Sequence, residues 1–325
     1  QKPNQVVPSA LWWLPGSVLV GALLGFVGAL VGTRLKREES PARSGPAGLA
    51  RVSVVATLLL LIIGGLVTSK EAGLAVVDWP NTFGYNMFLY PLSRMTGGIF
   101  YEHAHRLFGA LVGLTTIGLA IRLWRRDERG WVQRLATIAV GLVVIQGVLG
   151  GLRVTGGFTL STSEADMAPS IALAVTHGVL GQVFLGFVVA LVVVTATAWI
   201  EAPAAEPRAS AGGDRTLQVF LIATLVVQLV LGAFQRHMAQ GLIVHISLAA
   251  VVVMIAVVAG ARAWGLYHGV WPVQHLGQLL MAGVAVQVTI GIAALAVTQG
   301  RAVVGAPSTL EVTIATAHQA TGALM

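Results

Sequence analysis

The sequence predicts an all-α polytopic membrane protein, built from two pseudo-symmetric four-helix bundles and one extra N-terminal transmembrane helix. Three observations predict this fold class. Of the 325 residues, 56% are hydrophobic and only 10% are charged, and several apolar runs approach the roughly 20 residues that cross a bilayer. Basic residues gather between these runs, and histidines recur inside them at duplicated spacings. The net charge of +7 therefore indicates membrane orientation rather than nucleic-acid binding.

Nine apolar runs are candidate membrane spans, and each is expected to be a helix because backbone groups in hydrocarbon must bond within their own segment. They cover residues 11–33, 50–68, 101–123, 133–152, 169–199, 216–235, 241–263, 275–298 and 309–325. We interpret the first run as an anchor rather than a signal peptide, since basic residues follow it. The chain begins at Gln1 and stops at Met325 inside an apolar run, so we expect a processed or incomplete chain with a truncated last helix.

The connections between the runs predict an orientation. Those at residues 33–51 and 122–134 are strongly basic and should be cytoplasmic. The mixed, Pro/Ala/Gly-rich connection 201–215 and the weakly basic 261–275 fall on the same side. The long connection Ser69–Phe100 then lies outside, and its aromatic, Pro and Gly residues suggest an ordered interfacial loop.

The same reading divides the chain into four parts. Residues 1–49 hold the extra helix and a basic cytoplasmic linker, and residues 50–200 form an N-terminal four-helix half. Residues 201–215 are a cytoplasmic linker, and residues 216–325 form a C-terminal four-helix half. There is no cysteine, which excludes disulfides and thiolate-held metals, so any metal must be held by His, Met or carboxylates.

Four histidines near the outer ends of predicted spans show the duplication. The spacing is 72 residues from His105 to His177 and 73 from His245 to His318. Across the halves, His105 and His245 are 140 residues apart, and His177 and His318 are 141 apart. An internal duplication of four helices explains these offsets, with the first span outside it.

The residues around the histidines repeat as well. "QGVLGGLRVT" (146–155) resembles "QVTIGIAALAVT" (287–298) at an offset of 141. "GGLVTSKEAGL" (64–74) resembles "GAFQRHMAQGL" (232–242) at an offset of 168. The difference between the offsets corresponds to the long outer connection of the first half, which is reduced to "RHMAQG" in the second.

The histidine-bearing spans all run from outside to inside, so the four imidazoles lie at similar depth. Two facing helices with one imidazole each can form a bis-His haem site, which predicts His105 with His177 and His245 with His318. A single histidine in a membrane helix is more often a hydrogen-bonded interior residue. Four at matched depth favour ligation, because polar groups in hydrocarbon are expensive. Zinc is less favoured, since its ligands cluster at one point.

An acidic residue distinguishes the first pair. In a helix Glu102 lies on the same face as His105 and Arg106. It could instead favour the start of the helix through the dipole, or simply pair with Arg106. The equivalent residue in the second half is Leu242. We therefore expect chemistry at the first-half pair and a fixed cofactor at the second.

The other histidines are expected to lie elsewhere. His103 is about 200° around the helix from His105 and should face lipid headgroups or the loop. His237, His268 and His275 fall in predicted connections and should be solvated.

Over about residues 50–325 the sequence resembles the haem A synthase family, membrane enzymes that convert haem O to haem A. The resemblance rests on four segments in order: "GGLVTSKEAGLAVVDWP", "EHAHRLFGALVG", "THGVLGQ" and "AHQATGAL". It implies eight helices in two halves, with the substrate haem in the first half and a bound haem b in the second. By motif position it implies that Glu102, His105 and His177 form the substrate site, and that His245 and His318 ligate the haem b iron.

The resemblance also implies a reaction, in which two successive hydroxylations and loss of water convert a porphyrin methyl group to a formyl group. Glu102 would stabilise a developing cation or move a proton. It implies the bacterial inner membrane, haem sites near its outer face, contact with lipids, haem O synthase and cytochrome oxidase assembly factors, and an electron donor. Some members carry a Cys pair where this chain has Val76 and Thr82, so a thiol relay is absent.

Four arginines on the predicted outer side could pair with haem propionates or serve only as interfacial anchors: Arg94, Arg153, Arg236 and Arg301. Two other functions also account for part of the pattern. A two-haem membrane cytochrome explains the four histidines but not Glu102. A transporter explains the duplication, but the halves share one orientation and no span is interrupted.

Overall fold

The computed structural model describes residues 45–155, 170–201, 208–298 and 306–325, and the expected span 11–33 lies outside them. Within this part of the chain, seven helices are long and apolar enough to cross a membrane. The helices are α2 (Gly45–Ser69), α3 (Gly97–Arg126), α4 (Gly130–Thr155), α5 (Ile171–Thr195), α6 (Thr197–Ile200), α7 (Ala211–Met238), α8 (Leu242–Leu266), α9 (Trp271–Thr298) and α10 (Thr309–Gly322). The expected all-α polytopic membrane fold is confirmed.

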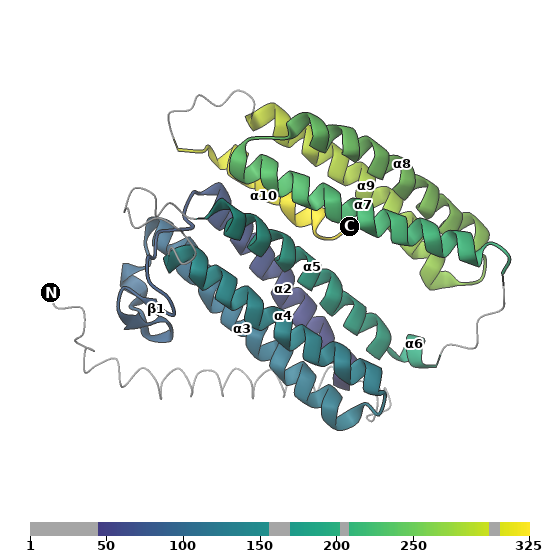
Figure 1. Ribbon diagram of the computed structural model, residues 1–325, viewed down its shortest axis with the longest axis horizontal. Coiled ribbons are helices and arrows are strands. Elements are labelled where there is room, and N and C mark those ends of the chain that lie inside the picture. Colours follow the sequence, from purple (N-terminus) through teal and green to yellow (C-terminus); the bar gives the residue numbers. More distant parts are fainter. Residues whose placement is uncertain (1–44, 156–169, 202–207, 299–305) are drawn as a thin grey trace.

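The helices gather into two groups that lie side by side, α2 to α5 and α7 to α10 (Figure 1). The first group has a core that includes Leu119, Leu123 and Leu185. The core of the second includes Leu221 and Val252. Large apolar side chains are also exposed along the helices, as expected where hydrocarbon replaces water around a span.

The two groups meet where α2 packs on α10. A Cβ added at Gly65 would lie 3.1 Å from Cγ2 of Thr316 and 3.2 Å from Oε1 of Gln319, so the glycine permits this close approach. The hydroxyls of Ser69 and Thr316 are 3.0 Å apart. Arg236 of α7 donates to the Gly65 carbonyl at 3.1 Å and to the Ser69 hydroxyl at 2.5 Å. Polar contacts therefore join the two groups inside an apolar protein.

The loop between α2 and α3, residues 70–96, is folded rather than simply extended. It holds β1 (Asn81–Thr82) paired antiparallel with β2 (Tyr85–Asn86), and the 3₁₀ turns η1 (Met87–Leu89) and η2 (Leu92–Arg94). The carboxylate of Asp78 accepts hydrogen bonds from the backbone N–H groups of Phe83 at 2.7 Å and Gly84 at 2.8 Å. This arrangement agrees with the ordered loop expected from its composition.

Helix α7 begins at Ala211, inside the segment expected to be a linker. Asp214 in its first turn accepts hydrogen bonds from Arg262 at 2.6 Å and from the Tyr267 hydroxyl at 2.8 Å. An acidic residue in the first turn also complements the helix dipole. These contacts with the end of α8 extend α7 beyond its apolar run.

Candidate functional site

The structure brings together the histidines that the spacing paired. The rings of His105 on α3 and His177 on α5 face each other, with centroids 6.2 Å apart and planes inclined by 81°. The rings of His245 on α8 and His318 on α10 are 6.5 Å apart and inclined by 86°. Each group of helices therefore contains one histidine pair.

The two pairs fit the axial ligands of a haem. Metal–imidazole bonds are about 2 Å long and a ring nitrogen lies about 1 Å from its centroid, so an iron between two imidazoles requires centroids about 6 Å apart. The Nδ1 atoms of His105, His177 and His318 are buried without a hydrogen-bond partner. Among the described residues no three His, Cys, Asp or Glu side chains gather as a bare-metal site. Paired imidazoles instead suit a metal that a porphyrin ligates in its plane.

Each of the four imidazoles lies against a glycine of the preceding helix. The distances from an added glycine Cβ to the imidazole Cε1 are 3.0 Å for Gly64 and His105, 3.4 Å for Gly150 and His177, 3.1 Å for Gly232 and His245, and 2.9 Å for Gly291 and His318. The glycines repeat at the same offsets of 168 and 141 residues that the sequence showed. The repeat of these glycines was visible in the sequence. Their contact with the imidazole rings, which leaves space for each ring beside the preceding helix, was not.

Replacing Gly291 with alanine is expected to displace the His318 ring, because the added methyl would lie 2.9 Å from its Cε1 atom. Over-packing of this kind typically costs about 1–3 kcal/mol, so affinity for added haem should fall about tenfold or more. Absorbance titration of the purified protein with ferric haem b measures this change. In the control Gly147→Ala, the new methyl meets nothing within 4 Å. Equal affinity in the two variants would contradict the seating role.

Glu102 is buried, with 4% of its surface exposed. One carboxylate oxygen accepts a hydrogen bond from Arg106 and the other from the backbone N–H of Val76, both at 2.8 Å. Arg106 also donates to the carbonyls of Val76 at 2.7 Å, Asp78 at 2.6 Å and Asn81 at 2.8 Å. The pair therefore fastens the α2–α3 loop to α3, one helical turn from His105.

Sequence reasoning had left several roles open for the residues near Glu102. The pairing with Arg106 is present, whereas α3 begins at Gly97 and has no acidic residue in its first turn, so Glu102 does not start the helix. His103 faces the loop, with Nδ1 3.1 Å from the Thr82 hydroxyl and its ring packed on Tyr90.

Of the three histidines expected in solvated connections, two lie in helices, His237 in α7 and His275 in the first turns of α9. His237 is half-buried within α7, because this helix continues to Met238. His268 and His275 are exposed, as expected.

The four candidate arginines differ in their surroundings. Arg94 is exposed in the loop and donates to the Tyr85 hydroxyl at 3.1 Å. Arg153 lies at the end of α4 against Gly73, and Arg236 reaches α2. The Nε atoms of Arg153 and Arg236 are both buried without a hydrogen-bond partner, so each has a donor available for an anion. Arg301 lies outside the described residues.

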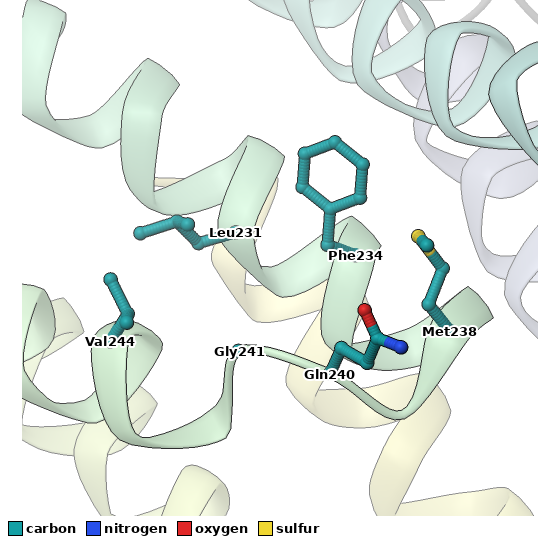
Figure 2. Close-up of a pocket in the computed structure, with 6 residues that line it drawn as sticks. All are labelled: Leu231, Phe234, Met238, Gln240, Gly241 and Val244. Carbon is teal, nitrogen blue, oxygen red and sulfur yellow. The ribbon is translucent and has the colours of Figure 1, made fainter.

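A pocket of about 290 Å³ opens at the turn between α7 and α8 (Figure 2). It is lined by Leu231, Phe234, Met238, Gln240, Gly241 and Val244. Neither histidine of the second pair is among the residues that line it. The short turn between α7 and α8 has no counterpart of the folded α2–α3 loop.

Comparisons with known proteins agree with the family resemblance. A family model described as "Cytochrome oxidase assembly protein" matches residues 47–247. Two proteins named Heme A synthase are similar: one from Shouchella clausii is 36% identical over 126 residues, covering 37% of this chain and 39% of that protein. The other, from Brucella ovis, is 27% identical over 163 residues, which cover 47% of this chain and 42% of that protein.

A protein named Protoheme IX farnesyltransferase, from Haloarcula marismortui, is also similar. It is 28% identical over 138 residues, covering 42% of this chain and 27% of that protein. The matched segments thus span roughly a quarter to two fifths of the length of these curated relatives.

Proposed function

The chain belongs to the haem A synthase family of cytochrome oxidase assembly proteins, and from this premise we propose that it oxidises a porphyrin methyl group of haem O to the formyl group of haem A. The observation that carries the proposal is the His105–His177 pair, whose ring centroids are 6.2 Å apart. The carboxylate of Glu102 lies one helical turn before His105. The matching pair in the other helix group has Leu242 in place of the acid.

The substrate haem would be held between α3 and α5 by the imidazoles of His105 and His177. Each hydroxylation replaces a methyl C–H bond by C–OH, takes its oxygen atom from water and releases two protons and two electrons, and the electrons pass to an oxidant such as dioxygen. The resulting diol loses water to give the aldehyde. His245 and His318 hold a haem b whose iron, when bound, supplies one-electron transfer.

Glu102 is the catalytic residue in this proposal. Hydrogen bonds from Arg106 and the Val76 N–H hold its carboxylate in one orientation. A fixed negative charge can stabilise positive charge that develops at the methyl carbon, or the carboxylate can accept its proton. Leu242 can do neither, which assigns the chemistry to the first half and the resident cofactor to the second.

The surroundings of the two sites complete the proposal. Arg153 and Arg236, with their free Nε donors, are the preferred propionate partners, followed by Arg94 and Arg301. The protein lies in a bacterial inner membrane with both sites near the outer face. The linker expected at 201–215, whose last residues belong to α7, separates the two halves. A haem farnesyltransferase supplies haem O, and assembly factors of cytochrome oxidase receive the product.

Extraction and chromatography of the bound pigments test this function. We expect haem O and haem A together with haem b in protein purified from a host that makes haem O. Haem b alone would favour the two-haem cytochrome, which transforms nothing. Absence of haem absorbance would favour the transporter and overturn the proposal.

A further inference from the structure

Three of the four histidines are held by a glutamine as well as by a glycine. On each of these preceding helices the glutamine lies four residues before the glycine. Its Nε2 donates to the backbone carbonyl of the histidine: Gln146 to His177 at 3.1 Å, Gln228 to His245 at 3.0 Å and Gln287 to His318 at 3.1 Å. Residues four apart share one helix face, so glycine and glutamine act on the same histidine.

The two contacts restrain different parts of the histidine. The glycine limits where the ring can lie, and the glutamine fixes the backbone of the neighbouring helix at that residue. At the second pair the amide of Gln228 also lies 3.1 Å from Nδ1 of His245. The amide of Gln287 is itself held, because Thr321 donates to its Oε1. Both histidines of the second pair are therefore held by a glutamine from the preceding helix.

His105 lacks this contact. The residue four positions before Gly64 is Leu60, whose side chain has no hydrogen-bonding group. The backbone at this position interacts with the imidazole in all four cases, through Leu60 as through Gln146, Gln228 and Gln287. Only the side-chain hydrogen bond to the histidine carbonyl is missing at His105. The same place in the duplicated unit thus holds a polar amide three times and an apolar side chain once.

We propose that Gln146, Gln228 and Gln287 are positioning residues that lock their histidines as haem ligands, and that Leu60 makes His105 the ligand most readily displaced. The first site then releases its haem while the second retains it. This inference rests on the proposed function, since a substrate must enter and leave but a resident haem must stay. The difference at position 60 would let the first histidine pair release its product haem, while the similar second pair keeps its haem as a cofactor.

A reciprocal exchange of the two side chains tests the proposal. The purified full chain is loaded with ferric haem b, and transfer of the haem to excess apomyoglobin is followed by absorbance. We expect a fast phase from the first site and a slow phase from the second. Gln228→Leu should accelerate the slow phase about fivefold, the effect of one hydrogen bond between neutral groups. Leu60→Gln should slow the fast phase by a similar factor.

A spectroscopic measurement separates positioning from a general loss of stability. Carbon monoxide binds ferrous haem only where an axial histidine leaves, so Gln228→Leu should raise the rate of its binding at the second site, whereas Leu60→Gln should lower that rate at the first. Gln274→Leu is the matched control, because Gln274 donates to the Trp264 carbonyl at 3.2 Å, away from both pairs. Leu60→Met controls for any change at position 60.

The outcomes distinguish the inference from the function on which it rests. Unchanged transfer and carbon monoxide binding in a folded, haem-loaded Gln228→Leu protein would overturn the positioning role and leave the synthase proposal standing. A protein that takes up no haem would overturn both. The Gln228→Leu result decides the proposal even where Leu60→Gln prevents folding.

Discussion

Glu102→Gln is expected to lower the rate of haem A formation by about 10²- to 10⁴-fold, the usual contribution of a positioned acid or base, while both haems stay bound. The amide keeps an oxygen that can accept the hydrogen bond from the Val76 N–H, so the α2–α3 loop should stay attached to α3. What the variant lacks is the negative charge and the proton acceptor. Chromatography of haems extracted from membranes over time measures the rate.

The anchoring role of Glu102 requires its own control. Arg106→Gln removes most of the same loop contacts, since Arg106 bonds three backbone carbonyls of the loop, but it leaves the carboxylate in place. We expect a smaller loss of haem A formation than in Glu102→Gln. If Arg106→Gln lowers the rate as much, the loop contacts or the orientation of the carboxylate limit the rate, and the charge of Glu102 alone does not account for it. If Glu102→Gln makes haem A at the normal rate, the proposed chemistry is wrong.

His318→Ala is expected to remove the haem of the second half while the first half still binds haem. The alanine leaves His245 without its facing imidazole, whose ring lies 6.5 Å away in the intact protein. Because the proposal places the resident haem b there, haem A formation should also stop. Haem content per chain and the absorbance spectrum of the reduced protein give both results.

His275→Ala is the matched control for this variant. It changes an exposed histidine on α9 that accompanies neither pair, and it should leave haem content and spectrum unchanged. A His318→Ala protein with a full haem complement would show that α10 does not supply a ligand, and would require a different partner for His245.

Much of the architecture could be predicted from the sequence because hydrocarbon imposes strict rules on it. A run of apolar residues without charges can satisfy its backbone only as a helix. The spans that fall within the described residues were therefore found within a few residues of their observed ends. The duplicated spacing of His105, His177, His245 and His318 identified which rings would face each other. Helix ends were less predictable: α7 extends into the linker because Asp214 bonds Arg262 and Tyr267, which are distant in sequence.

The sequence by itself therefore determined the membrane fold, the repeat and the pairing of histidines, because each follows from local hydropathy and regular spacing. Only the tertiary structure decided how these residues are held. Three sets of contacts join segments that are far apart in the chain. Glu102 and Arg106 hold the α2–α3 loop, Arg236 bonds α2, and glutamines bond the backbone carbonyls of histidines. Such contacts depend on how two helices are rotated against each other, which packing sets and the order of residues along one helix does not.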